Sequence, residues 1–318
     1  KRVIVPCLFA LSLCTFGCAA AADLPQLVAF RFFAGVFTPG VIAVVLSYIS
    51  EEAPGGRVSF VTSLYVTGTV FGGLTGRLSS AFIADHMNWR ASFAALALLT
   101  FAGAVMTWFF LPRSRSFRRR AKIEGAPRAM LGHLRNPKLR ATYLTGFNAL
   151  FCHVGLFTYA NFHLSKPPFS LSTSALGMIF LVYALGIVIT PLAGRMIDRI
   201  GHRKGASVAI GFIASGLLLT LVPDITAFIA GLAVASSGIF IMQSAASSHV
   251  AQSAKEARSA ATGLYVSFYY FGGSIGATLL AVPWKLGGWG AIIAAMLCVQ
   301  CVSLAAVRMF FADRPARP

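Results

Sequence analysis

The chain has 318 residues, of which 57% are hydrophobic and 11% are charged, and its mean hydropathy is +0.75. A soluble globular domain is roughly half apolar and a quarter charged, so this composition excludes an ordinary soluble protein and indicates a membrane protein. The net charge of +18 needs its own explanation, because basic chains also bind nucleic acid or anionic lipid.

The apolar residues are gathered in blocks of about twenty, the length of a helix that crosses a hydrocarbon core of about 30 Å. These blocks are apolar on all sides and lack the period-two alternation of barrel strands, so we expect an all-α polytopic membrane protein. In chain order, the ten predicted spans are residues 3–22, 27–49, 58–83, 91–112, 141–163, 171–194, 205–223, 225–247, 260–283 and 287–311.

The first span has a second possible interpretation. It begins with Lys1-Arg2 and is followed by an alanine run, which is also the pattern of a secretory signal peptide. Its apolar stretch is longer than the usual 7–15 residues of a signal, and another span follows almost at once. We therefore interpret it as a transmembrane helix.

The basic residues outside the spans fall mostly on one side of the predicted membrane. If Lys1 is cytoplasmic, the opposite side carries only Arg90, Lys166 and Lys285. This positive-inside pattern predicts a multi-pass protein of the inner (plasma) membrane, with the Lys1 end, the central loop and the C-terminus in the cytoplasm. It also explains most of the net charge. The run RSRSFRRRAK has no nucleic-acid-binding module around it, so we expect lipid and not nucleic acid as its neighbour.

A repeat with an offset of 200 residues divides the chain into two parallel halves. TSLYVTGTVFGGLTG, which begins at Thr62, aligns without a gap with TGLYVSFYYFGGSIG, which begins at Thr262. Trp89 likewise aligns with Trp289. Similarity at a fixed offset is typical of transporters built from duplicated helix bundles.

The same offset, stretched by two residues, aligns Lys1-Arg2 with Arg203-Lys204. In the second half, two predicted spans lie within residues 141–204, before that point, whereas the first half has no counterpart of them. We therefore expect the chain to be an N-terminally truncated fragment that lacks the first two helices of a longer protein.

Three stretches carry a resemblance to a known family. GRMIDRIGHRK begins at Gly194, LVAFRFFAG contains Arg31, and GTVFGGLTG begins at Gly68. They are similar, in that order, to the loop signature, the fourth-helix arginine motif and the glycine-rich fifth-helix motif of the major facilitator superfamily. The third stretch departs from the family pattern, because Gly73 stands in place of a proline and Arg77 in place of the final glycine.

The resemblance implies the major facilitator fold, with two pseudo-symmetric bundles and ten of the usual twelve transmembrane helices. Residues 1–112 would be the remaining four helices of the N-terminal bundle, equivalent to the third to sixth, and residues 141–318 the six-helix C-terminal bundle. Residues 113–140 would form a basic cytoplasmic central loop, in which APRAMLGHLRNPKLR could form a short interfacial helix. The similarity is greatest to the bacterial drug and sugar efflux group of drug:proton antiporters.

In the family, the aspartate of the loop signature faces the start of a helix in the opposite half, where N–H groups and the helix dipole favour an anion. Asp198 occupies that position here. The resemblance implies a cytoplasmic gate that closes when the halves meet and breaks when they rock, whereas the alternative is that these charges only set the topology. The gate residues would be Arg57, Gly194, Asp198, Arg199, Gly201, Arg203 and Arg258.

Polar residues inside apolar spans are costly unless they face water or a partner, and so they are candidates for function. In the family, the arginine at the position of Arg31 is linked to proton coupling and substrate handling; the alternative is an arginine that snorkels to the interface. His153 could carry protons, although a buried neutral histidine satisfied by a neighbour is commoner. The predicted substrate and proton pathway comprises Arg31, Arg77, Tyr65, Asn148, His153 and Gln243.

Glycines spaced by four residues let helices approach closely, so the two copies of the glycine motif are expected to pack helices. They are Gly68, Gly72, Gly73 and Gly76 in the first half and Gly272, Gly273 and Gly276 in the second. By contrast, no carboxylate lies in the middle of a span, because the following acidic residues lie at span ends or in turns: Asp23, Glu51, Glu52, Asp85, Asp224 and Asp313. We therefore expect the acceptor of a coupling proton in the two helices before Lys1.

No phosphate-binding glycine loop and no nucleophile–base pair occurs, and the cysteines lie in apolar spans, so we expect no enzyme activity, no cofactor and no metal site. The expected function is secondary active transport of a small organic molecule by a monomer. The molecule would be exported, and its efflux would be coupled to protons. An uptake symporter or facilitator of the same fold is one alternative. A non-transporting membrane receptor or assembly protein is the other.

Overall fold

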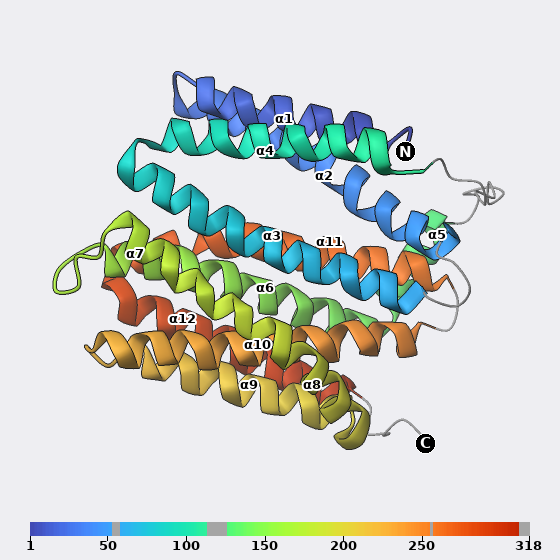
Figure 1. Cartoon of the computed structure of the whole chain (residues 1–318). Helices are drawn as coiled ribbons and strands as arrows, with labels where there is room; N and C mark the ends of the chain where they lie inside the picture. The colour runs from blue at the N-terminus through green and yellow to red at the C-terminus, as the bar shows by residue number, and fades with distance from the viewer. Residues whose placement is uncertain (53–57, 113–125, 255–256, 312–318) are drawn as a thin grey trace. The chain divides into compact units, whose positions relative to one another are not determined.

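The computed structural model describes residues 1–52, 58–112, 126–254 and 257–311, and within these ranges all regular structure is helical (Figure 1). The helices are α1 (Ile4–Ala20), α2 (Leu24–Glu52), α3 (Val58–His86), α4 (Trp89–Phe110), α5 (Ala126–Arg135), α6 (Pro137–Leu164), α7 (Thr173–Met178), the 3₁₀ helix η1 (Ile179–Ala184), α8 (Leu185–Ile200), α9 (His202–Leu219), α10 (Ile225–Ser253), α11 (Arg258–Leu279) and α12 (Ala281–Phe310).

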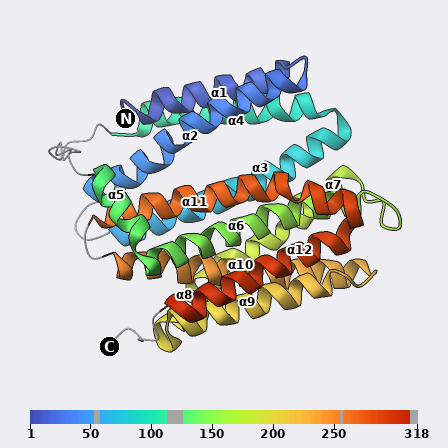
Figure 2. The same cartoon turned by 180° about the vertical axis from the view of Figure 1, so that it is seen from behind.

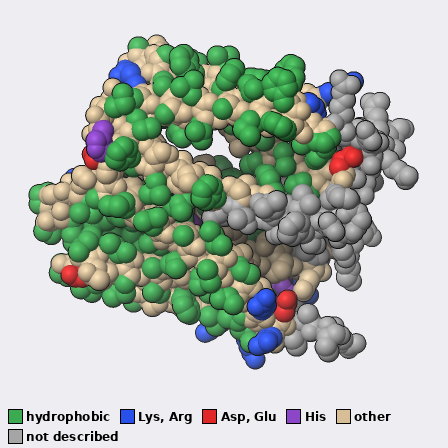
Figure 3. Space-filling model, in the orientation of Figure 1, with side chains coloured by type: hydrophobic (Ala, Val, Ile, Leu, Met, Phe, Trp, Pro, Cys, Tyr) green, Lys and Arg blue, Asp and Glu red, His purple; other side chains and the backbone are tan. Residues whose placement is uncertain are grey.

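The all-α polytopic prediction is confirmed, and every predicted span coincides with helix. By length and apolar composition alone, five described helical segments could cross a membrane: Leu24–Ile42, Trp89–Phe110, Thr173–Ile200, Ile225–Val250 and Ala281–Phe310. The remaining long helices, such as α3 and α11, carry more Gly, Ser and Thr. Hydrophobic side chains cover the sides of α1 and α4, whereas charged side chains gather at helix ends (Figure 3).

Short polar side chains define several helix starts. The side-chain oxygen of Asn88 accepts a hydrogen bond from the Ala91 N–H at the start of α4, and Asp224 does the same for Ala227 at the start of α10. Asn136 caps α6, whose first residue is Pro137. Each cap satisfies an N–H group that has no partner within its own helix, so these turns are fixed by local sequence.

The described residues divide into two compact units, of which unit 1 comprises residues 1–121 and 172–180. Within it, α1, α2 and α4 lie side by side (Figures 1 and 2). The Ser12 hydroxyl on α1 donates to the Ala97 carbonyl on α4 at 2.9 Å, and the rings of Phe9 and Phe101 meet edge to face at 5.4 Å. A polar bond and an aromatic contact therefore join α1 to α4.

Unit 2 comprises residues 122–171 and 181–318 and is organised around α6, which packs against α10, α11 and α12 (Figure 2). The helices α9 and α10 also pack closely. A Cβ atom added to Gly231 would lie 2.8 Å from the Gly216 carbonyl oxygen, and one added to Gly238 would lie 2.7 Å from the Ala209 oxygen. Only glycine allows backbones to approach this closely, as is common between membrane helices.

The sequence repeat accounts for a break inside α12. Gly287 and Gly288 have non-helical dihedral angles, and Gly288 has a φ of 59°, which glycine adopts readily. These positions correspond, at the offset of 200, to the turn between α3 and α4. The last predicted span, residues 287–311, begins at the first residue of this break, and regular helix resumes at Trp289, whose indole N–H donates to the Thr220 carbonyl at 3.1 Å.

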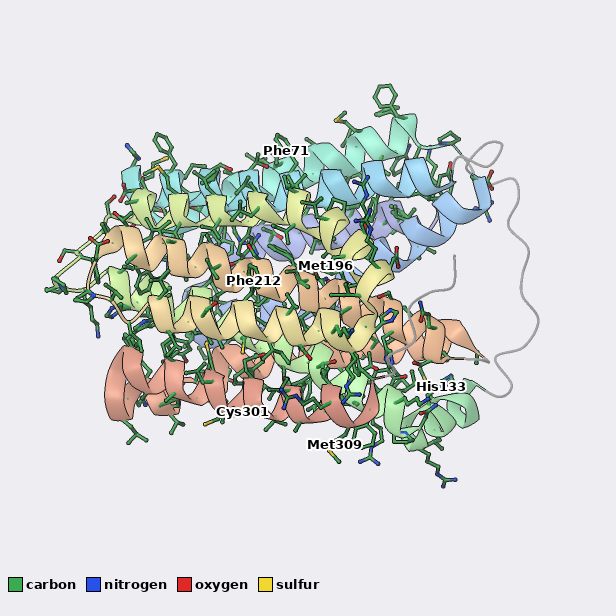
Figure 4. The ribbon with its side chains drawn as sticks, turned by 90° about the horizontal axis from the view of Figure 1, so that it is seen from below. Phe71, His133, Met196, Phe212, Cys301 and Met309 are labelled. Atoms are coloured by element: carbon green, nitrogen blue, oxygen red, sulfur yellow. The ribbon has the colours of Figure 1, made fainter. Side chains whose placement is uncertain are left out.

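The predicted short helix before the second half corresponds to α5, which ends at Arg135, so that residues 137–140 already belong to α6. On the outer surface of unit 2, Cys301 and Met309 point away from the neighbouring helices (Figure 4). The predicted division into residues 1–112, 113–140 and 141–318 stays a prediction. The compact units differ from it at residues 172–180, which pack with α3.

Candidate functional site

In unit 2, an aromatic cluster surrounds His153, one of the predicted pathway residues. The buried imidazole on α6 lies 4.7 Å from the Tyr183 ring of η1 and 5.6 Å from the Phe240 ring of α10, measured between centroids. Phe157, one turn further along α6, lies 4.6 Å from Tyr183. A titratable ring is thus held among aromatic faces where three helical segments meet.

Close packing keeps this aromatic cluster in place. A Cβ atom added to Gly186 on α8 would lie 2.7 Å from the Phe240 ring, so this glycine gives the ring its room. The sequence analysis missed Tyr183, Phe157 and Phe240. The four-residue spacing of His153 and Phe157 places both on one face of α6 and was the available signal.

Asn148, also on α6, faces a different neighbour. Its side-chain N–H donates to the Ser303 hydroxyl of α12 at 2.7 Å, and both residues are buried. One turn away, the Gln300 amide donates to the Cys152 sulfur at 3.1 Å. These bonds tie α6 to α12 inside unit 2, so the structure does not bring Asn148 together with the His153 cluster.

The other two neutral pathway candidates lie on different units. Gln243 is half-buried on α10 in unit 2, and Tyr65 is half-buried on α3 in unit 1. Their assignment to a substrate pathway stays a prediction.

Arg31 and Arg77 are exposed on unit 1, and each guanidinium lies over an aromatic ring. Arg31 on α2 lies 4.8 Å from the centroid of Phe93 on α4. Arg77 on α3 lies 5.4 Å from the Phe180 ring and donates to the Gly73 carbonyl of its own helix at 3.0 Å. Stacking of this kind offsets part of the cost of a charge in an apolar helix.

A cavity of about 300 Å³ lies beside the Arg31 stack. Phe93 lines it together with Leu27, Trp89, Asp23 and the alanines at the end of α1. Its wall is mostly apolar, with the Asp23 carboxylate as the one acidic group that lines it. The embedded arginine of the fourth-helix motif therefore stacks on the wall of a small cavity within unit 1.

The loop signature forms the turn between α8 and α9. Gly201 has a φ of 85°, and its N–H donates to the Ile197 carbonyl at 2.8 Å, which ends α8 and reverses the chain. Glycine is the residue that adopts such an angle without strain. A Cβ atom added to Gly194 would meet nothing within 4 Å in the part of the chain that the structure describes, Asp198 and Arg199 are exposed, and Arg203 is half-buried.

The predicted gate partners cannot be compared with this turn. Arg57 lies outside the described residues, and of Arg258 only the backbone, at the first position of α11, lies within them. The gate therefore stays a prediction.

One histidine of the loop signature, His202, forms a buried pair with His249 of α10 that the sequence analysis did not single out. His202 hydrogen-bonds to the Ser248 hydroxyl at 3.0 Å, and His249 to the Thr142 hydroxyl at 2.7 Å. The two rings lie 5.5 Å apart. His249 also stacks on Phe311 at 4.1 Å.

Burial lowers the pKa of His202, and the nearby Asp198 carboxylate partly opposes this effect. His202 is therefore neutral at pH 7 and acts as a hydrogen-bonding partner. The signal in the sequence was the histidine at the variable position of GRMIDRIGHRK.

The two copies of the glycine motif have different surroundings. Gly272 and Gly276 on α11 lie directly against the backbone of Phe147 and Phe151 on α6. By contrast, a Cβ atom added to Gly68 or Gly72 on α3 would meet nothing within 4 Å among the described residues.

The remaining glycines of the motif follow the same division. A Cβ at Gly273 would contact Leu150 at 2.9 Å, whereas one at Gly76 would approach only Leu96, at 3.9 Å. At Gly73, the nearest atom belongs to Arg77 of the same helix, at 3.3 Å.

Comparison with known proteins places this architecture in a family. A family model described as the Major Facilitator Superfamily matches residues 1–277 and 163–318. The inner membrane transport protein YnfM of Escherichia coli is 34% identical over 306 residues, which are 94% of this chain and 73% of YnfM. The MFS-type transporter YybF of Bacillus subtilis is 31% identical over 291 residues, 90% of this chain and 72% of YybF.

Solved structures share the fold. The crystal structure of a bacterial homologue of the human lysosomal transporter Spinster, in an inward-facing and unoccupied conformation, superposes with a TM-score of 0.76. The superposition covers 100% of this chain and 85% of the chain of the Spinster homologue, and the two sequences are 16% identical.

Proposed function

Because this chain belongs to the Major Facilitator Superfamily, we propose that it carries a small organic molecule across the membrane by alternating access, with protons driving efflux. The protein is a membrane transporter of this family, and its curated relatives are named as transporters. Proton coupling, the outward direction and the drug or sugar type of substrate are the proposed part. The resemblance of the α3 glycine motif to the antiporter branch supports them.

The observation that carries the proposal is the arginine on α2. Arg31 lies about two turns inside an apolar helix, where a charge is costly unless it faces water or a partner group. It stacks on Phe93 beside a cavity of about 300 Å³. A fixed positive charge near a cavity can hold an anionic substrate group or alter the proton affinity of a neighbouring carboxyl group.

The histidine on α6 is the proposed second element of the pathway. His153 lies among Phe157, Tyr183 and Phe240, and such an aromatic surface suits an apolar or aromatic substrate. Tyr65, Arg77, Asn148 and Gln243 complete the proposed pathway.

We propose that the protein lies in the inner (plasma) membrane, with the Lys1 end, the central loop and the C-terminus on the cytoplasmic side. The basic residues of the turns support it through the positive-inside rule. In this orientation, Asp198 and its neighbours would form the cytoplasmic gate with Arg57 and Arg258. The protein would act as a monomer, and the prediction of two further helices before Lys1 stays a prediction.

The test is transport by the purified full chain in liposomes. Ethidium, a labelled hexose and labelled benzoate are offered as probes with and without an imposed proton gradient. Flux that depends on the gradient and collapses with a protonophore supports the proposal. Flux that survives the protonophore favours a facilitator, and flux of the probe in the same direction as protons favours an uptake symporter.

A variant identifies the role of the arginine. Arg31→Lys keeps the charge but loses the planar stacking on Phe93, so gradient-driven flux should fall by about tenfold or more. Lys285→Gln, at an exposed helix position, is the control and should leave flux unchanged. Absence of flux for every probe would favour a receptor or assembly protein.

A further inference from the structure

An apolar groove with a volume of about 430 Å³ runs between α1 and α4 in unit 1. Its walls are formed by Phe9, Leu13 and Phe16 of α1 and by Leu98 and Phe101 of α4. Ser12 also lines it, but its hydroxyl already donates to the Ala97 carbonyl at 2.9 Å. Because these side chains offer no free polar group, the groove suits a hydrocarbon chain better than a polar solute.

The groove lies on the side of α1 and α4 that does not meet α2. On α1, a Cβ atom added to Gly17 would lie 2.6 Å from the Phe30 ring of α2. On α4, the Phe93 ring lies under the Arg31 guanidinium of α2. The residues that line the groove, by contrast, all belong to α1 and α4. The groove is therefore open on the side away from α2.

The sequence repeat indicates that this open side faces lipid. At the offset of 200, Leu98 and Phe101 correspond to Cys298 and Cys301 of α12. Both cysteines are exposed, and Cys301 points away from the neighbouring helices of unit 2 (Figure 4). Leu98 and Phe101 are exposed as well. An apolar surface of this kind marks a contact with the membrane.

A second cavity, of about 300 Å³, lies at the Lys1 end of the same two helices. It is lined by Lys1, Arg2, Val5 and Pro6 and by Trp108 of α4. The Trp108 ring lies 6.0 Å from the Phe9 ring, so this basic pocket adjoins the groove. None of the described residues that line the pocket is acidic. Two cations beside an indole suit an anionic headgroup at the membrane surface.

The spacing of the two cavities along α1 matches one leaflet of a bilayer. Phe16, at the far end of the groove, follows Pro6 by ten residues. Ten residues of helix rise by about 15 Å, which is half of a hydrocarbon core of about 30 Å. Lys1 and Arg2 lie before Pro6 and therefore at the depth of the headgroups. A single phospholipid has its charge and its chain at this separation.

Duplication of the bundle does not account for the aromatic walls. With the offset stretched by two residues, Lys1-Arg2 align with Arg203-Lys204, and Phe9 aligns with Gly211. Phe101 aligns with Cys301 at the offset of 200. The second half thus keeps the basic pair but lacks these rings. The groove is particular to unit 1, which favours a binding site over a general feature of the fold.

We propose that unit 1 binds one anionic phospholipid of the leaflet at the Lys1 end. Its phosphate lies between Lys1 and Arg2, and one acyl chain follows the groove from Phe9 to Phe16. In the proposed orientation this is the cytoplasmic leaflet. Because the lipid contacts both α1 and α4, it stabilises their packing. The inference does not depend on the proposed transport function.

The first experiment measures lipid binding to the full chain. The purified protein in a mild detergent is titrated with phosphatidylglycerol or with phosphatidylcholine of the same acyl chains, and native mass spectrometry gives the dissociation constants. The parent should bind one phosphatidylglycerol about tenfold more tightly than phosphatidylcholine. Lys1→Gln/Arg2→Gln should abolish this preference. The control Lys138→Gln/Arg140→Gln, which removes two exposed basic side chains of α6, should keep it.

The second experiment tests the groove. Leu98→Trp fills part of the groove and should weaken the binding of both lipids by about tenfold. Met106→Trp, at an exposed position of α4 that lines neither cavity, is the matched control and should bind both lipids like the parent. Phosphatidylglycerol should also raise the thermal midpoint of the parent, and it should not raise that of Lys1→Gln/Arg2→Gln. If Leu98→Trp does not fold, the charge variants still decide.

Several results would overturn the lipid site. One is an equal dissociation constant of the two lipids in the parent, and another is a preference that Lys1→Gln/Arg2→Gln leaves unchanged. Displacement of phosphatidylglycerol by inorganic phosphate would assign the basic pocket to a free anion. A dimer that carries no lipid would show that a second copy of the chain covers the groove.

Discussion

The duplicated glycine motif offers a pair of matched substitutions, Gly272→Ala and Gly72→Ala. Both add one methyl group to a helix at equivalent positions of the repeat. In unit 2, a Cβ on Gly272 would lie 2.7 Å from the carbonyl carbon and 2.8 Å from the Cα of Phe147. In unit 1, a Cβ on Gly72 meets nothing within 4 Å among the described residues.

The structure sets the size of the expected effect. The Phe147 carbonyl oxygen lies closer still to this Cβ position, so α11 must move away from α6 by more than the ~0.7 Å that an ordinary contact of 3.4 Å with the carbonyl carbon requires. Forcing a methyl group into a packed interface typically costs about 1–3 kcal/mol. The helix propensity of alanine is also more favourable than that of glycine by about 1 kcal/mol. At position 72 this gain is the only expected effect, because no described residue opposes the added methyl group. Gly272→Ala should therefore lower the free energy of unfolding by up to about 2 kcal/mol, whereas Gly72→Ala should leave it unchanged or raise it by up to about 1 kcal/mol.

Unfolding in detergent micelles measures both variants. Thermal denaturation followed by fluorescence-detected gel filtration gives the midpoint of each protein relative to the parent. Equal losses of stability in the two variants would refute the reasoning, because they would mean that α3 packs as tightly as α11. A stable Gly272→Ala protein would show that the α11–α6 interface yields without cost.

Three further predictions concern individual contacts. His202→Gln should flatten the pH dependence of stability between about pH 7 and 5. The pKa of His202 is lower in the folded than in the unfolded protein, so the unfolded state binds more protons as the pH falls below about 6.5. The parent protein therefore loses stability in that range, and the variant should not. Ser303→Ala should cost about 0.6 kcal/mol of stability, and a double-mutant cycle with Asn148→Ala should show coupling, since their bond joins two membrane helices. Phe93→Leu should destabilise unit 1 by about 0.5–1 kcal/mol in thermal unfolding, and it should do so no longer when Arg31 is already replaced by Leu.

Much of the fold follows from the sequence alone. The ten predicted spans all coincide with helices, because a chain in lipid must satisfy its own backbone groups and its apolar blocks are long enough to cross. The turn at Gly201 lies between the predicted spans 171–194 and 205–223, and the repeat aligns Trp289 with Trp89 at the first position of the equivalent helix. These features depend on residues that are neighbours in the chain.

The site residues were less predictable, because their partners are distant in sequence. Asn148 and His153 lie on one helix only five residues apart, yet one bonds to α12 and the other lies against η1 and α10. The spacing of residues on a helix defines its faces, but only the arrangement of the other helices decides what each face meets.

The glycine motif shows this limit most clearly. Two nearly identical stretches, around Gly72 and Gly272, give one open helix face and one backbone interlock. The sequence by itself determined that both stretches are helices with a smooth, small-residue face. Only the tertiary structure decided which of the two faces is filled and that residues 172–180 pack against α3. Packing depends on contacts between segments that lie far apart along the chain.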